Sequence, residues 1–250
     1  MKVPDSIDDH WLEIDVGANR IFWKRFGGRP DMKGAAVLDI GSCRGSLCVD
    51  MAAAGAARVT GLDINPEFVD YARAMVVKRY PELVGRVAFQ LGALSQFPAA
   101  TFDYIVSKDV FEHVMDLPAL LAEIRRCLKP GGRLYAGYGP LFYAPNGAHG
   151  TFGPIPWGHL FLPDTWLLAM ANHGRAQKVA SLDELNDWNR LSFSEHRDRL
   201  HGAGLRVVAF TVNQSGHPVS RLFSLFRHVP GLRNYFTHNI YCVLEKESKE

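Results

Sequence analysis

The chain has 250 residues, of which 47% are hydrophobic and 22% are charged. This composition excludes a disordered chain, a collagen-like repeat and a bundle of membrane helices. The 28 basic and 26 acidic residues leave a formal charge of +2, and because the basic residues are scattered, the sequence predicts no nucleic-acid partner. For this length we expect one domain with an elaborated region.

The sequence indicates a reduced, cytoplasmic setting. The four cysteines form no CxxC pair and show no zinc-ligand spacing, so neither a disulfide framework nor a metal knot is expected. Asp5, Asp8 and Asp9 stand where a signal peptide would need a basic start and an apolar core. No apolar run approaches the roughly 18 residues of a membrane span. We therefore expect a cytoplasmic protein without a membrane partner.

Short apolar runs alternate with helical segments between residues 35 and 137. The run over 35–40 reads AAVLDI, which is typical of a buried strand, and a glycine follows it. The apolar residues of 67–79 recur at helical spacing, with Pro81 just beyond. In chain order, we expect a strand over 35–40, a helix over 47–54, a strand over 58–62, a helix over 67–79, strands over 87–91 and 104–107, a helix over 117–128 and, after a break at 130–132, a strand over 133–137.

This alternation predicts parallel βαβ units, with ligands at the carboxyl ends of the strands. The rhythm stops after residue 138, because 139–164 is irregular and rich in glycine, proline and aromatic residues. A loop of this length is more often functional than idle, although it could be a surface excursion that packs its own aromatic side chains. Regular signals return as helices over 164–173 and 194–203 and strands over 205–212 and 240–245.

The turn after the first strand carries the strongest chemical signal. It reads Asp39-Ile-Gly41-Ser-Cys-Arg-Gly45, and glycine lets a backbone approach a ligand without a Cβ atom in the way. Asp63, at the end of the next strand and 22 residues after Gly41 (63 − 41), can accept hydrogen bonds from ribose hydroxyls. The GxxxG spacing differs from the GxGxxG of pyrophosphate-binding sites, so a nucleoside cofactor without phosphates is favoured. Simple turn glycines, and Asp63 as a helix cap, are the alternatives.

These residues resemble the class I S-adenosylmethionine-dependent methyltransferases. In that family the first strand ends in acidic-x-Gly-x-Gly-x-Gly, which Asp39, Gly41 and Gly45 fit, while Cys43 replaces the middle glycine. The resemblance covers about residues 35–137 and implies an α/β, Rossmann-like, seven-stranded and mostly parallel sheet with helices on both faces and an inserted lid region. Further motifs follow in the family's order, namely TFDYIV at 101–106, FEHV at 111–114 and LKPGGRL at 128–134.

The resemblance implies S-adenosylmethionine as cofactor and a small-molecule acceptor. Asp63 would bind the ribose, and Gly92 and Ala93 would lie by the adenine, although the acidic residue often found there is absent. Ser107 and Lys108 would line the methionine end. The full set of implied cofactor residues is Asp39, Gly41, Ser42, Cys43, Gly45, Asp63, Ile64, Gly92, Ala93, Ser107 and Lys108.

Three histidines are candidates for a catalytic base. Methyl transfer from a sulfonium is an in-line displacement, in which the protein aligns the nucleophile, excludes water and can remove a proton. His113 follows the fourth strand, and His149 and His159 lie in the aromatic excursion; packing for the first, and hydrogen bonds to the excursion's own backbone for the other two, are the alternatives. Nothing fixes His149, His159 and Asp164 as metal ligands, so no metal site is predicted.

The sequence divides the chain into four segments: an N-terminal helical cap over 1–34, a cofactor-binding core over 35–138, an inserted acceptor or lid region over 139–204 and terminal strands over 205–250. The amphipathic segment 11–26 could cover the cofactor or dock on the sheet edge.

We expect a methyltransferase that acts on a small molecule, with oxygen as the favoured target atom. N- or C-methylation would leave the same pattern. A non-catalytic, methyltransferase-like binding or scaffold protein is the alternative that Cys43 and the missing acid near Gly92 support. The acceptor and the oligomeric state are not identified by the sequence.

Overall fold

The computed structural model describes the backbone of residues 9–185, 188–213, 221 and 224–248, and the side chains from residue 17 onward within these ranges. Asp5, Asp8 and the side chain of Asp9, which entered the sequence predictions, lie outside this description.

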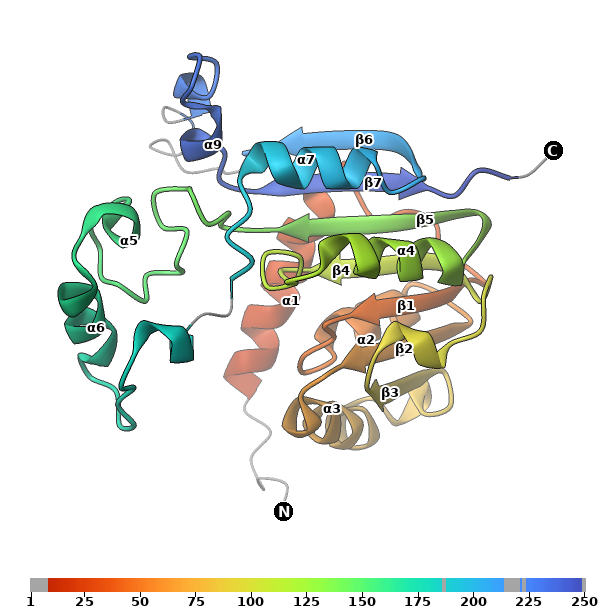
Figure 1. Ribbon diagram of the computed structural model, residues 1–250. Helices are drawn as coiled ribbons and strands as arrows, with labels where there is room; N and C mark the ends of the chain where they lie inside the picture. The colour runs from red at the N-terminus through yellow and green to blue at the C-terminus, as the bar shows by residue number, and fades with distance from the viewer. Residues whose placement is uncertain (1–8, 186–187, 214–220, 222–223, 249–250) are drawn as a thin grey trace.

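Seven strands form one sheet in the order β3-β2-β1-β4-β5-β7-β6 (Figure 1). Strands β1 to β5 are parallel, and β7 is antiparallel to both β5 and β6. The strand order reverses between β1 and β4, where α/β sheets bind their ligands. The strands are β1 (Ala36–Ile40), β2 (Arg58–Asp63), β3 (Val87–Leu91), β4 (Phe102–Lys108), β5 (Leu128–Tyr138), β6 (Arg206–Val212) and β7 (Ile240–Glu245).

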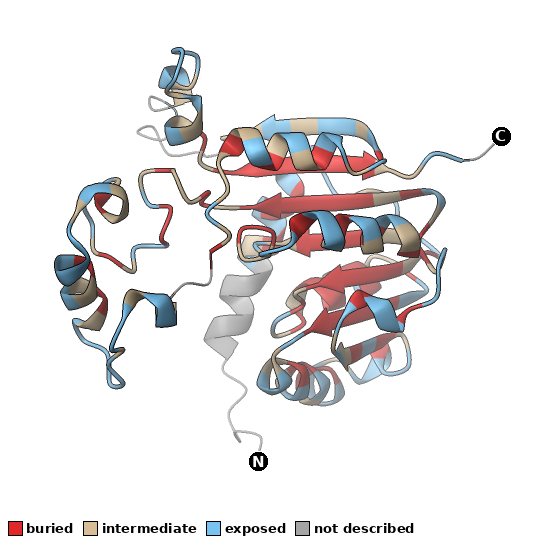
Figure 2. Cartoon of the chain, in the orientation of Figure 1, coloured by how far each residue is buried: buried red, intermediate tan, exposed pale blue. Residues whose placement is uncertain are grey.

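Helices cover both faces of the sheet, as predicted (Figure 1). One buried cluster joins one sheet face to α1 (Asp9–Lys24), α2 (Ser46–Ala53) and α3 (Pro66–Arg79). A second joins the other face to α4 (Leu117–Cys127) and α7 (Phe193–His201). Figure 2 shows the central strands buried between these layers, whereas the edge strand β6 is exposed or half-buried. The core therefore consists of two apolar layers with the sheet between them.

Side-chain caps fix where the helices begin. The Asn65 Oδ1 atom accepts a hydrogen bond from the Glu67 N–H at 2.9 Å, and Pro66 occupies the first turn of α3. The Asp116 Oδ1 atom accepts from the Ala119 N–H at 3.0 Å and caps α4. Such caps satisfy backbone donors that have no partner within the helix.

The described half of α1 packs on the face of the sheet rather than on its edge. Phe22 and Trp23 are buried in the first cluster. The Trp23 Nε1–H donates to the Asp50 Oδ2 atom of α2 at 2.7 Å, and the Asn19 Nδ2–H donates to the Ser46 Oγ atom at 3.2 Å. This helix therefore lies beside α2.

The helix before residues 130–132 ends at Cys127, as expected, but the strand predicted over 133–137 begins earlier, because β5 starts at Leu128 and continues through 130–132. Its pairing with β4 passes from Phe102 opposite Leu128 to Tyr104 opposite Arg133, which is a bulge in β5. At Gly132 a Cβ atom would lie 2.9 Å from the Lys129 carbonyl oxygen. A bulge absorbs the extra residues while the ladder continues.

Residues 139–190 form an insertion beyond the end of β5, and Figure 1 shows β4 and β5 pointing toward it. It carries α5 (Gly158–Phe161), α6 (Asp164–Asn172) and the 3-10 helix η3 (Leu182–Leu185). The shorter elements elsewhere are the 3-10 helices η1 (Pro81–Leu83) and η2 (Leu94–Gln96) and the helix α9 (Arg233–Phe236). A small, separate cluster of buried residues forms the centre of the insertion: Ala148, Phe152, Leu167, Ala171 and Trp188.

Within the described ranges, none of the helices is both long enough and apolar enough to cross a membrane.

Candidate cofactor and acceptor sites

Two glycines shape the turn after β1. Gly41 and Gly45 have φ angles of +72° and +84°, which L side chains rarely adopt. A Cβ atom at Gly41 would lie 2.3 Å from the Val110 Cγ2 atom, and one at Gly45 would lie 2.5 Å from the Phe89 Cζ atom. The backbone conformation and the neighbouring side chains therefore require glycine at both positions, whether or not a ligand binds at this turn.

Cys43 takes a glycine-like conformation at the position where it departs from the family pattern. Its φ angle is +48°, and the residue is exposed. This left-handed geometry costs an L residue roughly 1–2 kcal/mol. The Cys43 N–H donates to the Asp63 Oδ2 atom at 2.8 Å. The turn thus adopts a left-handed conformation at this position without a glycine there.

Asp63 connects this turn to the end of β2. Its Oδ1 atom accepts from the Asn65 N–H at 2.9 Å, while Oδ2 accepts from Cys43. The alternative that Asp63 caps the following helix is wrong, since Asn65 is the cap. Asp63 therefore positions the turn and also presents its carboxylate to a neighbouring cavity.

A cavity of about 370 Å³ lies at the carboxyl ends of β1, β2 and β3. This volume is within the range of small-molecule sites, roughly 300–1,000 Å³. Val110, Val114, Leu120 and Glu123 line it from the other side, although the sequence did not indicate them. Five of the predicted cofactor residues line it: Gly41, Asp63, Ile64, Gly92 and Ala93.

The other six predicted cofactor residues do not line this cavity. The Ser107 Oγ–H donates to the Ile40 carbonyl at 3.3 Å, and the Lys108 Nζ atom donates to the Asn19 Oδ1 atom at 3.1 Å. Ser42 is buried, and its Oγ atom has no hydrogen-bond partner among the described residues. Cofactor contact stays a prediction for Asp39, Ser42, Cys43, Gly45, Ser107 and Lys108.

Asp39 is a buried carboxyl group beside this site. It is 2% exposed, and its Oδ2 atom accepts from the Cys48 Sγ–H at 3.3 Å. Burial raises its pKa to about 7, against the lowering effects of the Cys48 hydrogen bond and of the Lys108 charge. Loss of hydration disfavours the charged form, which explains the direction.

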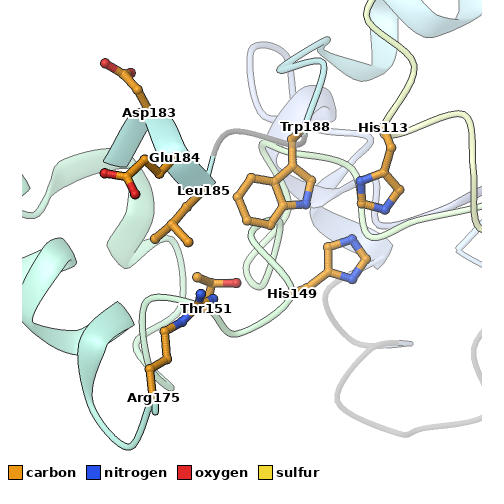
Figure 3. A pocket seen from close by; sticks show the side chains of 8 residues that line it. All are labelled: His113, His149, Thr151, Arg175, Asp183, Glu184, Leu185 and Trp188. Carbon is orange, nitrogen blue, oxygen red and sulfur yellow. The ribbon is translucent and has the colours of Figure 1, made fainter. Parts of the chain in front are cut away.

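A second cavity, of about 510 Å³, lies between the end of β4 and the insertion (Figure 3). The turn over 110–114 contributes to both cavities, because Val110 and Val114 line the first and His113 lines the second. The two cavities therefore share this turn. The residues lining the second cavity are His113, His149, Thr151, Arg175, Asp183, Glu184, Leu185 and Trp188.

The structure brings two of the three predicted histidines together. The His113 and His149 rings stack with centroids 5.3 Å apart, and the His149 ring lies 6.1 Å from that of Trp188 at an angle of 21° (Figure 3). The His159 Nε2 atom instead lies 2.6 Å from the Phe142 carbonyl oxygen, and burial lowers the pKa of His159. His159 thus contacts the backbone of its own loop and does not line the second cavity.

Glu112 is a buried carboxylate in the turn over 110–114 that the sequence reasoning missed. It is 2% exposed, and its Oε1 atom accepts from the Gly139 N–H at 3.0 Å. Its Oε2 atom has no partner among the residues described. Burial raises the pKa of Glu112 to about 8. The motif FEHV pointed to this turn, but only burial distinguishes the glutamate from an ordinary surface acid.

Comparison with known proteins identifies relatives of the core. Residues 38–136 match the family described as methyltransferase domain. The ubiquinone biosynthesis O-methyltransferase of Xanthomonas oryzae pv. oryzae is 36% identical over 107 residues, which is 43% of this chain and 44% of that protein. Its counterpart in Xylella fastidiosa is 36% identical over 107 residues and 43% of each chain. The chain thus spans less than half the length of these relatives.

Several solved structures of similar fold are described as methyltransferases. An S-adenosylmethionine dependent methyltransferase from Mesorhizobium loti has a TM-score of 0.58 and 16% identity, covering 94% of this chain and 99% of that one. Geranyl diphosphate C-methyltransferase from Streptomyces coelicolor has a TM-score of 0.60 and 15% identity, covering 98% and 86%. At these identities the likeness shows the fold alone. Residues 38–136 are thus similar to a methyltransferase domain, which supports the resemblance to the class I S-adenosylmethionine-dependent methyltransferases that the sequence motifs indicated.

Proposed function

We propose that this chain transfers the methyl group of S-adenosylmethionine to an oxygen atom of a small-molecule acceptor. The observation that carries this proposal is the pair of cavities that share the turn over 110–114. The names of the curated relatives, ubiquinone biosynthesis O-methyltransferases, support oxygen as the target atom. The scattered basic residues favour a small molecule over a nucleic acid, and the cysteine spacing, which indicates no disulfide framework, favours the cytoplasm.

The first cavity has the shape and the groups that the cofactor requires. Asp63 presents a carboxylate where ribose hydroxyls would donate hydrogen bonds. Ile64 is 84% exposed at the rim and offers an aliphatic surface to an adenine ring. Gly92, which has a φ angle of +136°, and Ala93 line the adjoining wall, and their small size leaves space beside it. When bound, S-adenosylmethionine supplies an electrophilic methyl group on a good leaving group.

The second cavity supplies what an acceptor with a hydroxyl group requires. His113, which follows β4, and His149, in the insertion, both line this cavity. Either imidazole can take a hydroxyl proton. Trp188 gives a flat apolar wall, while Arg175 and Glu184 offer charged contacts of opposite sign (Figure 3). An acceptor with a ring and a polar substituent matches these surfaces.

Calorimetric titration with S-adenosylmethionine and S-adenosylhomocysteine tests the cofactor site. Ile64→Ser should weaken binding by about 5- to 10-fold, because roughly 1 kcal/mol of apolar contact is lost. Val77→Ser is the matched control, since Val77 is also a β-branched residue, 64% exposed on α3, and does not line the cavity. Its affinity should equal that of the wild type. Absence of binding at millimolar concentration would refute the proposal.

Transfer of a labelled methyl group to a panel of phenols, enols and amines tests the chemistry. Label in an ether product supports oxygen as the target atom, and label in an amine product supports N-methylation instead. Tight cofactor binding without any labelled product would favour the scaffold alternative.

A further inference from the structure

We propose that Glu112, His113 and His149 bind a divalent transition-metal ion of the Zn²⁺ type at the wall of the second cavity. One ligand atom from each residue lies within 4.8 Å of the other two. Two imidazole nitrogens and one carboxylate form the donor set of many catalytic zinc sites and of mononuclear iron(II) sites. The sequence predicted no metal, because nothing in the spacing brings residue 149 to residues 112 and 113.

Small side-chain movements would close this set around an ion. Metal–ligand bonds of about 2.1 Å at tetrahedral angles place donor atoms about 3.4 Å apart. The three donors must therefore approach by up to about 1.4 Å. Glu112 is buried, whereas His113 is partly exposed and His149 is exposed. The carboxylate is thus the fixed ligand, and the two imidazoles have room to turn toward it.

Glu112 has an unsatisfied oxygen that a cation would complete. Its Oε1 atom accepts from the Gly139 N–H, and the buried Oε2 atom lacks a partner within the described chain. A buried polar atom without a partner costs roughly 1–3 kcal/mol. The Gly139 N–H holds the carboxylate in place, as outer-shell donors do for metal ligands. A metal ion therefore explains an atom that the protein itself leaves unsatisfied.

His149 is held in an uncommon backbone conformation that directs its ring to this place. Its φ angle is +51°, in the left-handed region. Such residues cluster at functional sites, where the surrounding structure maintains them. The ring stacks on His113 and also lies against Trp188, which is 6% exposed (Figure 3). The insertion thus brings a third ligand to Glu112 and His113, which follow β4.

A site with three protein ligands leaves one position open. His113 and His149 line the second cavity, so the open position would face the acceptor. The following role rests on the proposed function. With both imidazoles holding the ion, neither serves as the base, and an acceptor hydroxyl bound at the open position has a lowered pKa and releases its proton to solvent. The oxygen–carbon bond then forms as the sulfur–carbon bond breaks with its electron pair left on sulfur, giving a methyl ether, S-adenosylhomocysteine and one proton.

Metal binding is measured without cofactor or acceptor. Chelator-treated protein is titrated with Zn²⁺ by calorimetry and with Co²⁺ by visible absorption, and one ion per chain at micromolar affinity or tighter is expected. His149→Ala removes an exposed ligand, and Glu112→Gln preserves the side-chain shape. Each should weaken binding by about 100-fold, since loss of outer-shell groups alone costs 10- to 100-fold. His173→Ala, an exposed histidine at the end of α6, should bind like the wild type.

Three results would overturn the proposal. These are no stoichiometric ion in the wild type, unchanged affinity in both ligand variants, or an equal loss in His173→Ala. Because His149 is exposed, its replacement tests the site even where Glu112→Gln folds poorly. Methyl transfer by a protein that binds no ion would refute the metal site alone. One bound ion in a protein that binds no S-adenosylmethionine would refute the proposed function alone.

Discussion

The sheet core and the insertion are stabilised in different ways. The core consists of two buried layers in which Leu38, Ile105 and Leu134 have no exposed surface. The insertion over 139–190 has short helices, local turn hydrogen bonds and a small cluster in which Phe152 is 9% exposed. Dense non-local packing specifies one backbone, whereas a small cluster tolerates adjustment. This difference agrees with our proposal, in which the core holds the cofactor and the insertion shapes the acceptor site.

The family match follows the same division. It ends at residue 136, near the end of β5 and before the insertion begins. The match therefore covers the cofactor cavity and one wall of the second cavity, but not Thr151, Arg175 or Trp188. Acceptor specificity is expected in the segment without a match.

A pair of phenylalanine replacements gives the largest expected difference between the regions. Phe102→Ala removes a ring that is 2% exposed in the second cluster and should lower the free energy of unfolding by about 4 kcal/mol. Phe152→Ala lies in the separate small cluster. It should change the core transition by less than about 1 kcal/mol, because the insertion can open locally. Urea unfolding followed by circular dichroism measures both.

Limited proteolysis is the second measurement for this pair. Phe152→Ala should be cleaved faster within 139–190, while the core fragment persists. Equal destabilisation by the two replacements would show that the insertion and the core unfold as one cooperative unit, and the comparison would fail.

The pH dependence of stability tests the buried acid of the core. In the unfolded chain Asp39 ionises near 3.8, whereas in the folded protein its pKa is raised to about 7. Between these values the folded state holds a proton that the unfolded state has released, so stability falls as the pH rises. The stabilising contribution is complete below 3.8 and lost above about 7. The slope is at most about 1.4 kcal/mol per pH unit.

Asp39→Asn should flatten this slope, because asparagine does not titrate. Free energies of unfolding of both proteins, measured across the same pH window, give the comparison. Glu112 contributes in the same direction, since its pKa rises from 4.5 to about 8, and it remains in the variant. The variant therefore keeps part of the slope. Parallel curves for the two proteins would show that Asp39 is ionised in the folded state.

The sequence predicted the regular elements of the core because local pattern decides them. The run at 35–40 and the helical spacing of 67–79 both appear where expected, as β1 and α3. The bulge at 130–132 could not be predicted, because proline and glycine indicate a break unless the neighbouring strand is known to continue. The pairing of β5 with β4 depends on residues that are distant in the sequence.

The second cavity could be predicted only in part. The residue types singled out His113 and His149, but their stacking depends on how the chain returns after β5. Glu112 and Trp188 were missed, because burial gives them their importance and one sequence does not report burial. His159 has the right chemistry, but its Nε2 atom lies 2.6 Å from the Phe142 carbonyl oxygen, which agrees with the alternative that the sequence left open for this histidine.

A matched pair of glycines should give the smallest and cleanest difference. Gly45 in the core and Gly150 in the insertion have similar φ angles of +84° and +75°. An alanine at either position therefore costs about 1 kcal/mol in backbone strain. At Gly45 the new Cβ atom would also lie 2.5 Å from the Phe89 ring, whereas at Gly150 no atom lies within 4 Å.

Gly45→Ala should therefore lower the free energy of unfolding by about 3 kcal/mol, because overpacking adds about 2 kcal/mol to the strain. Gly150→Ala should lower it by about 1 kcal/mol or less. Urea unfolding of the two variants isolates the packing contribution, since their backbone strain is nearly equal. Equal costs would mean that Phe89 moves aside freely, and the core would then be no more tightly packed at this turn than the insertion is.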